Sequence, residues 1–294
     1  MRWKKVTLVG VGLLGGSLGL ALKKRKLAGE VVGFVRRAAS VEECERLGAV
    51  DSATRELSTA VNGSDLVVLC TPLAQMRGLA KQLAPSLKRG AIVTDVGSVK
   101  GRVVRELEGI IAKSGGHFVG SHPMAGAEKT GVGAARSDLF EHAICVVTPT
   151  RRSNKAAVGK VERLWKSVGA RVLRLTPEAH DELVSQSSHL PHLVAATLAN
   201  TVLAPGRPRQ QKALCANGFR DTTRIASGSP EMWRDIVLAN RKNLSAALGG
   251  LVKELQQLRR IVQRGDEAAI SDFLAQAKAR RDQWVAENGS ASPE

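Results

Sequence analysis

The sequence contains few aromatic residues and no tyrosine. Five Phe and four Trp are the only aromatic residues among 294. Proteins that bind single-stranded nucleic acid stack the bases on aromatic side chains interleaved with basic ones, and this composition offers no such platform. The net charge of +17 comes from Lys and Arg dispersed along the chain, without a basic tail. We therefore expect a solvated basic surface and no nucleic-acid partner.

Closely spaced cysteines and long unbroken apolar runs are also missing. The four cysteines are scattered and form no CxxC pair, which excludes a zinc knuckle and suits a reducing compartment. The apolar run from Val6 to Leu22 imitates part of a signal peptide, but glycines interrupt it and the basic residues 23–26 follow it. It is too short and too rich in glycine to span a membrane. We expect a cytoplasmic protein without a membrane partner.

Short aliphatic runs alternate with helical stretches up to about residue 175. This alternation is typical of βαβ units and predicts a doubly wound, Rossmann-type parallel sheet, an α/β fold. The strands are expected at Val6–Val9, Val31–Val35, Leu66–Cys70, Ile92–Asp95, His117–Gly120, Ile144–Thr148 and Arg171–Arg174.

Helical periodicity replaces the strand-like runs after Pro177. Leu244, Leu248, Leu251 and Leu255 recur at helical spacing, which predicts an all-helical C-terminal domain. We expect a Rossmann-type domain over 1–176, a helical domain over 177–288, and a disordered tail over 289–294. These parts fill the 294 residues, so we expect no further regulatory domain.

A glycine-rich loop follows the first expected strand and precedes a helix. Gly10, Gly12 and Gly15 have GxGxxG spacing, with Leu13 and Leu14 between the last two glycines. In this context the first glycine permits a tight turn, the second admits the pyrophosphate of a dinucleotide, and the third lets helix and strand pack closely. The motif predicts a nicotinamide dinucleotide as cofactor.

The end of the second expected strand bears on the choice of cofactor. NAD enzymes commonly have an acidic residue there to bind the ribose hydroxyls, but this position is Val35, followed by Arg36 and Arg37. Two arginines can bind a 2′-phosphate that a carboxylate would repel. We expect a preference for NADP, with NAD as the alternative cofactor; the alternative interpretation of Arg36 and Arg37 is a pair of solvated surface arginines.

Further segments, together with the glycine loop, resemble the prephenate/arogenate dehydrogenase family. They are Thr71-Pro72, DVGSVK (95–100), VGSHPMAGAEKTG (119–131), SHLPH (188–192) and GFRDTTRIASGSPEMWRDI (218–236). The resemblance implies that Thr71 and Pro72 adjoin the cofactor. It also implies oxidative decarboxylation of prephenate to 4-hydroxyphenylpyruvate, in which the ring carbinol carbon passes a hydride to the cofactor and the ring carboxylate leaves as carbon dioxide.

The resemblance also assigns two catalytic residues and a substrate-binding arginine. His122 matches the family's catalytic histidine, and we expect it in a loop just beyond a strand end. Ser98 matches the serine that orients it, although an N-cap of the following helix is the simpler alternative. Arg224 matches the arginine that binds a substrate carboxylate, and a surface salt bridge is its alternative.

Four more residues are expected at the substrate. His189 and His192 are spaced to face one way, and without a third ligand we expect substrate contacts and no metal site. Glu128 is expected to close the site. Trp233 is expected to form its apolar wall, with a core position as the alternative.

Prephenate is the expected substrate, because a pocket with two histidines and no acid suits a keto acid better than the ammonium of arogenate. The resemblance implies a homodimer formed through the helical domain, whose apolar face needs a partner. Three alternatives stay open at this point: an arogenate dehydrogenase, a β-hydroxyacid dehydrogenase, whose lysine pattern is missing here, and a dinucleotide-sensing regulator that binds nucleic acid.

Overall fold

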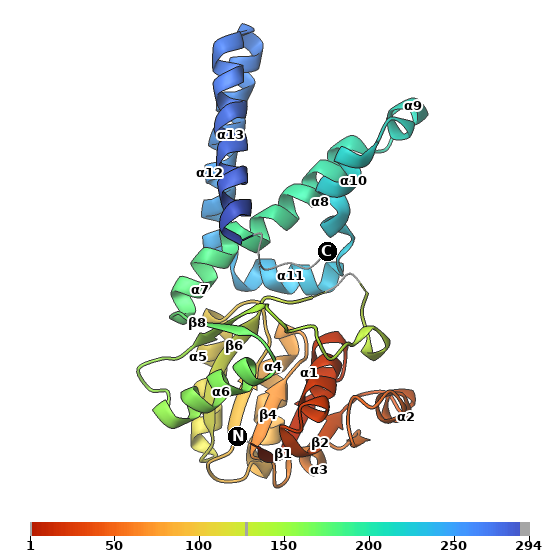
Figure 1. The fold of residues 1–294 in the computed structure, drawn as a ribbon, viewed down its shortest axis with the longest axis vertical. Helices are drawn as coiled ribbons and strands as arrows, with labels where there is room; N and C mark the ends of the chain where they lie inside the picture. The colour runs from red at the N-terminus through yellow and green to blue at the C-terminus, as the bar shows by residue number, and fades with distance from the viewer. Residues whose placement is uncertain (1, 127–128, 289–294) are drawn as a thin grey trace. The chain divides into compact units, whose positions relative to one another are not determined.

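A computed structural model describes residues 2–126 and 129–288, which form two compact units (Figure 1). The first unit, Met1–Arg241, contains the sheet and most of the helices, and the second, Lys242–Glu294, contains a pair of long helices. The predicted domain boundary, between residues 176 and 177, separates the part that contains the strands from the helical part that follows. It differs from the division into compact units at Arg241, and it stays a prediction.

The described residues of the first unit form one sheet in the order β3-β2-β1-β4-β5-β6-β7-β8. The reversal of strand order between β1 and β4 defines a doubly wound Rossmann-type fold. The α/β fold class is therefore confirmed. The strands are β1 Trp3–Val9, β2 Ala28–Phe34, β3 Ser52–Thr54, β4 Leu66–Leu69, β5 Ile92–Asp95, β6 His117–Pro123, β7 Ile144–Thr148 and β8 Arg171–Arg174.

The sheet differs from the prediction in the additional strand β3 and in the direction of one pairing. All pairs are parallel except β6 with β7, which is antiparallel and joins Gly120–Pro123 to Cys145–Thr148. This pairing extends β6 three residues beyond its expected end, because the backbone groups of Ser121 to Pro123 gain partners in β7. The expectation that His122 lies in a loop was wrong.

Both faces of the central strands are buried, which explains the continuous aliphatic runs in the sequence. On one face, Leu18 of α1 and Trp165 of α6 pack with alternate residues of β1 and β4. On the other, Met76 of α4 and Leu107 of α5 pack with the intervening residues. The helices of this part are α1 Leu13–Lys24, α2 Ala39–Arg46, α3 Leu57–Val61, α4 Leu73–Leu83, α5 Gly101–Lys113 and α6 Lys155–Ser167, with short 3₁₀ turns η1 Ala84–Ser86 and η2 Val132–Ala134.

The described residues after β8, up to residue 288, form helices and no strand, as predicted. Helix α7 begins at Pro177 after a Thr176 cap and contacts α5, while α11 contacts α4. The elements are α7 Pro177–Val184, the π-helical turn η3 Ser185–His189, α8 Leu190–Val202, α9 Arg209–Ala213, α10 Asn217–Thr223, η4 Arg224–Ser227, α11 Pro230–Ala239, α12 Arg241–Arg264 and α13 Glu267–Asn288.

In the second unit, α12 and α13 are joined through Gly265, whose φ of 62° permits the sharp reversal between them. Among the described helices of both units, none is long and apolar enough to cross a membrane.

Candidate active site

The predicted site residues of the Rossmann fold gather at one edge of the sheet. The strands β1, β4, β5 and β6 are consecutive in the sheet, and their carboxyl ends lead to Gly10, Thr71, Ser98 and His122 respectively. Helices cover both faces of the sheet (Figure 1), and these four residues share the edge at which the strands end. This is where doubly wound folds bind their ligands.

The three glycines of the loop are needed for two different reasons. Gly10 has a φ of 95°, and a Cβ on it would lie 2.9 Å from the Cys70 carbonyl oxygen. A Cβ on Gly15 would lie 2.1 Å from the carbonyl oxygen of Gly10. A Cβ on Gly12 would meet nothing within 4 Å. The fold itself therefore requires Gly10 and Gly15, whereas the space beside Gly12 fits a bound pyrophosphate.

A cavity of about 580 Å³ opens beside this loop and reaches Arg36, Arg37, Thr71 and Pro72. The Thr71 hydroxyl is buried without a hydrogen-bond partner in the described chain, so a ligand could satisfy it. Helix α1 starts at Leu13 and has no acidic residue in its first turn, which leaves its N-terminus favourable to an anion. Within the described residues that line the cavity, no side chain is a carboxylate. These features fit a dinucleotide.

His122 is nearly buried, with 7% of its surface exposed, and lies in β6 opposite Val146 of β7. Its Nδ1 lies 2.9 Å from Nε2 of His180, and the two rings meet edge to face. Burial lowers the pKa of His122 well below its ordinary value, and the nearby His180, Lys100 and His189 lower it further. The imidazole is therefore neutral at pH 7, the form that can accept a proton.

His189 and His192 lie on either side of the turn from η3 into α8, and both contact Trp233 of α11. His192 stacks on the indole at 3.4 Å between ring centroids, and His189 meets it edge to face at 6.1 Å. Burial lowers the pKa of His189 to about 4, opposed in part by Asp181 and the Ser98 backbone. Trp233 is half-buried beside the two histidines, and its role as the apolar wall of the site stays a prediction.

Ser98 lies in the loop between β5 and α5, but it does not cap α5. The helix begins at Gly101 with Lys100 at the N-cap position, and the carboxylate of Asp181 accepts the backbone N–H groups of Lys100 and Gly101. The N-cap alternative for Ser98 was therefore wrong. No hydrogen bond between the side chains of Ser98 and His122 is found in the described chain.

Arg224 begins the turn η4 and lines two cavities of the first unit. One cavity, of about 540 Å³, joins Arg224 to Leu13 at the start of α1 and to two further cations, Lys129 and Arg136. The other is lined by residues of α10 and η4. Three cations next to the cofactor loop form an environment suited to carboxylates.

Two family models together match most of the chain. One, described as the prephenate dehydrogenase nucleotide-binding domain, matches residues 18–174, and one described as the prephenate dehydrogenase dimerization domain matches residues 176–276. This chain belongs to the prephenate dehydrogenase family. The resemblance inferred from the motifs is confirmed, and with it an oxidoreductase function with a nucleotide-binding domain.

Individual members of the prephenate dehydrogenase family are similar to this chain over nearly its whole length. A prephenate dehydrogenase from Bacillus subtilis is 36% identical over 94% of this chain and 75% of its own. The crystal structure of an Aquifex aeolicus prephenate dehydrogenase, in complex with hydroxyphenyl propionate and NAD+, has a TM-score of 0.90 and 36% identity, covering 96% of this chain and 99% of its own. A Synechocystis arogenate dehydrogenase has a TM-score of 0.81 and 30% identity, covering 96% and 100%.

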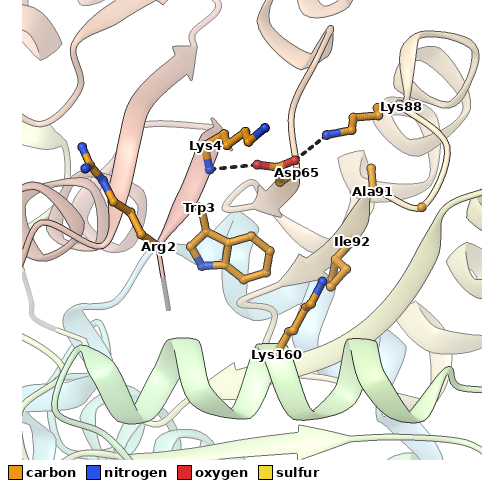
Figure 2. A pocket seen from close by; sticks show the side chains of 9 residues that line it. Arg2, Trp3, Lys4, Asp65, Lys88, Ala91, Ile92 and Lys160 are labelled. Carbon is orange, nitrogen blue, oxygen red and sulfur yellow. Dashed lines mark hydrogen bonds and ion pairs between the residues drawn. The ribbon is translucent and has the colours of Figure 1, made fainter.

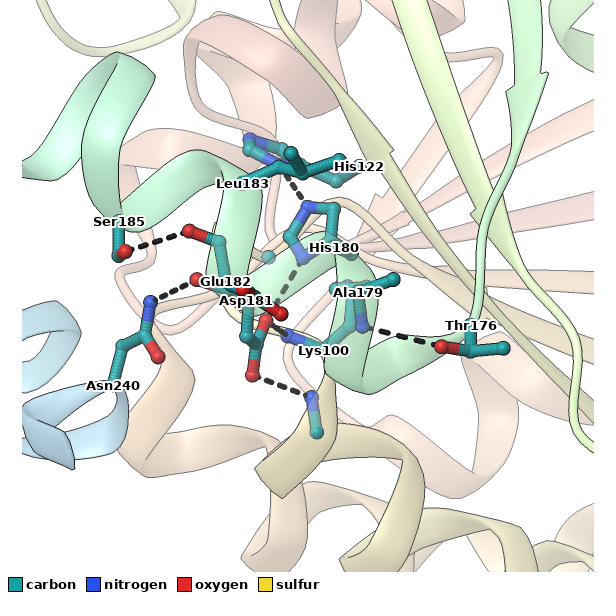
Figure 3. A network of polar contacts seen from close by, with 12 residues as sticks. Lys100, His122, Thr176, Ala179, His180, Asp181, Glu182, Leu183, Ser185 and Asn240 are labelled. Atoms are coloured by element: carbon teal, nitrogen blue, oxygen red, sulfur yellow. Dashed lines mark hydrogen bonds and ion pairs between the residues drawn. The ribbon is translucent and has the colours of Figure 1, made fainter. Parts of the chain in front are cut away.

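The family motifs did not identify every polar residue that the structure brings to the site. His180 and Asp181 of α7, together with Asn240 after α11, form a buried network with His122 and Lys100 (Figure 3). The only sequence signal was an adjacent His-Asp pair just after a helix start. Glu128, expected to close the site, lies outside the described residues. No group of three or more metal-ligating side chains is found in the part of the chain that the structure describes.

A further cavity, of about 360 Å³, lies at the opposite edge of the sheet, where β1 and β5 begin (Figure 2). Asp65 is bound there by the backbone N–H of Lys4 at 2.8 Å and by Lys88 at 2.5 Å. This cavity lies where β5 begins, whereas His122 lies near the end of the neighbouring strand β6. Asp65, the one acidic residue among the described residues that line the cavity, is already paired with Lys88. It therefore adds nothing to the family's chemistry.

Proposed function

We propose that this chain oxidises prephenate to 4-hydroxyphenylpyruvate, with His122 as the base that accepts the proton of the ring hydroxyl. The observation that carries the proposal is a buried, neutral imidazole at the carboxyl edge of β6, at the same edge as the glycine loop. A bound nicotinamide supplies the hydride acceptor. The residues of the chain exclude water, hold the substrate carboxylates and accept the proton.

The hydrogen-bonding state of His189 supports prephenate over arogenate. The amide nitrogen of Asn240 lies 3.2 Å from Nδ1 of His189 and also donates to the Asp181 carbonyl oxygen. Because an amide nitrogen only donates, Nδ1 of the neutral His189 is the acceptor and Nε2 carries the hydrogen. Nε2 is buried without a partner in the described chain. Such a donor suits a keto or carboxylate oxygen and disfavours an ammonium group.

Arg224 is proposed to hold a substrate carboxylate. Arg224→Ala should raise the KM for prephenate by roughly ten- to hundredfold, the equivalent of one or two charge-assisted hydrogen bonds, and change the cofactor KM far less. Arg224→Lys should recover only part of the loss, because lysine lacks the planar fork. Arg209→Ala, on exposed α9, is the matched control. An unchanged prephenate KM in folded Arg224→Ala would remove this residue from the site.

NADP is proposed as the preferred cofactor. Arg36 and Arg37 are exposed beside the cofactor cavity, and Arg55 donates to the Arg36 carbonyl oxygen at 3.2 Å, which fixes the backbone between them. Assays of prephenate and arogenate, each with NADP and NAD, should show the highest kcat/KM for prephenate with NADP. Arg36→Ala should weaken NADP by roughly ten- to hundredfold and NAD little.

Arg46→Ala, at the end of α2 and outside the cavity, is the control for the cofactor measurement. A tenfold preference of the wild type for NAD would contradict the NADP proposal, and faster turnover of arogenate would contradict the prephenate proposal. If neither substrate were oxidised and the chain bound DNA with a steep salt dependence, the regulator alternative would be favoured instead.

A homodimer is proposed as the working form. The family model matched by residues 176–276 is described as a dimerization domain. In the second unit, Leu255, Val262 and Leu274 are each at least half exposed. Apolar side chains gathered on long helices are typical of an interface between subunits. Light scattering across a range of protein concentrations tests this proposal.

A further inference from the structure

His122 is the end of a buried chain of hydrogen bonds (Figure 3). Its Nδ1 lies 2.9 Å from Nε2 of His180, and Nδ1 of His180 lies 2.8 Å from Oδ1 of Asp181. His180 is fully buried, and His122 and Asp181 are less than a tenth exposed. The three residues come from β6 and α7, 58 positions apart in the sequence at the first contact.

Asp181 is held as an acceptor by its other contacts. Its two carboxylate oxygens accept the backbone N–H groups of Lys100 and Gly101, at 2.7 and 2.8 Å, where α5 begins. Two N–H donors and the positive end of a helix dipole favour an ionised carboxylate. Its backbone is fixed as well, because Asn240 donates to the Asp181 carbonyl oxygen at 2.7 Å.

The direction of the two hydrogen bonds that link His122, His180 and Asp181 follows from this acceptor. An ionised carboxylate cannot donate, so the hydrogen of neutral His180 must be on Nδ1 and its Nε2 must accept. His122 then donates from Nδ1 to His180. The remaining nitrogen of His122, Nε2, carries a lone pair.

We propose that His180 and Asp181 are positioning residues that hold His122 in the Nδ1–H tautomer and so present Nε2 as the base. This inference rests on the proposed role of His122. When Nε2 takes the proton of the substrate hydroxyl, the new positive charge is spread toward Asp181 through His180, and no further proton has to leave the site. We call His180 and Asp181 the relay. Without the relay, neutral His122 would divide between two tautomers, only one of which has a basic Nε2.

Two substitutions of His180 separate hydrogen bonding from packing. His180→Gln can still accept from His122 with Oε1 and donate to Asp181 with Nε2, whereas His180→Phe fills similar space and does neither. We expect His180→Phe to lower kcat by about 10², with KM for prephenate and cofactor within threefold, and His180→Gln to retain most of the activity. His117→Phe, at the far end of β6, is the control for an aromatic substitution.

The double variant His122→Asn/His180→Phe shows whether His180 acts through His122. If it does, the double variant should be no slower than His122→Asn alone, because the relay has nothing left to position. Multiplied losses would overturn the proposal and indicate an independent structural effect. Wild-type kcat in His180→Phe would overturn it as well.

The pH profile gives a readout that a purely structural role would not move. His122 is faced by His180 from α7, by Lys100 before α5 and by His189 from η3, and Asp181 adds the negative charge behind His180. Asp181→Asn removes that charge, so the acidic limb of kcat should shift to lower pH as the plateau falls. An unmoved limb and plateau would contradict the relay.

The tautomer can be read without any substrate. Selective ¹⁵N labelling of histidine and NMR on the wild-type protein should show His122 protonated on Nδ1 and bare on Nε2, retained in His180→Gln and lost in His180→Phe. His122 protonated on Nε2 in the wild type would overturn the proposal. Because this measurement needs no turnover, a wrong assignment of substrate or reaction leaves its result interpretable.

Discussion

His122→Asn should lower kcat by about 10² to 10⁴ while leaving the affinity for the cofactor nearly intact. Asparagine keeps the size and part of the hydrogen-bonding capacity of histidine, but it cannot accept a proton. The ring hydroxyl would then develop charge in a site from which water is excluded, because His122 is nearly buried. The measurement is kcat at saturating substrate, with cofactor affinity determined separately.

The fall of kcat at acidic pH, the acidic limb of the profile, reports the protonation of the same residue, His122. Since burial and the neighbouring His180, Lys100 and His189 lower the pKa of His122, activity should fall only below the ordinary histidine value of about 6.5. His122→Asn should lose this limb. His142→Asn is the matched control, at a loop position whose φ of 64° asparagine tolerates. Turnover within threefold of the wild type in His122→Asn would make this residue structural.

Stability must be followed over the same pH range. The pKa values of His122, His180, His189 and His192 are all lowered in the folded state, mainly by burial. The contribution of each histidine to the free energy of unfolding is complete above about pH 6.5, the pKa in the unfolded chain. It is lost as the pH falls toward the pKa in the folded state, which is about 4 for His189. Unfolding curves at each pH therefore distinguish loss of catalysis from loss of the fold.

Lys100→Met should lower the free energy of unfolding by about 3–5 kcal/mol, the usual cost of removing one partner of a buried ion pair. Lys100 is fully buried, and its ammonium group forms an ion pair with the buried Asp95 and donates to the Ser121 carbonyl oxygen at 2.8 Å. Burial lowers the pKa of Lys100, and Asp95 opposes this change. Methionine has a similar length, so the main effect is an uncompensated carboxylate.

The double variant Asp95→Asn/Lys100→Met is the control for this argument. Replacing both charges by neutral groups should recover part of the loss, because the unpaired carboxylate is removed. The recovery is incomplete, because the two Asp95 oxygens accept the backbone N–H groups of Gly97 and Ser121 and an asparagine amide can replace only one of these acceptors. Urea unfolding followed by circular dichroism, at one protein concentration, measures both variants. A single variant that loses less than about 1 kcal/mol, or a double variant that recovers nothing, would contradict the account.

Most of the sheet could be predicted from the chain itself. The expected strands at Ile92–Asp95, Ile144–Thr148 and Arg171–Arg174 agree with β5, β7 and β8 at both ends. The three-residue β3 was missed, since so short a strand leaves no periodic signal. The end of β6 was missed because it depends on pairing with β7, a contact that no local pattern encodes.

The site was predicted unevenly for a similar reason. The glycine loop and His122 are carried by contiguous motifs, and the structure brings them to one edge of the sheet. His180 and Asp181 lie outside the family motifs of the sequence. Their importance comes from contacts with His122 and with the start of α5, which lie 58 and about 80 residues away.

The sequence by itself determined the features that depend on neighbouring residues. A positive φ at Gly10, the start of α1 at Leu13 and the burial of aliphatic strands follow from local sterics and from side-chain periodicity. Only the tertiary structure decided the contact between His122 and His180, the pairing of Lys100 with Asp95, and the partners of Asp181. A hydrogen bond between side chains depends on distances of a few tenths of an ångström between elements, and those distances are set by how helices and strands pack.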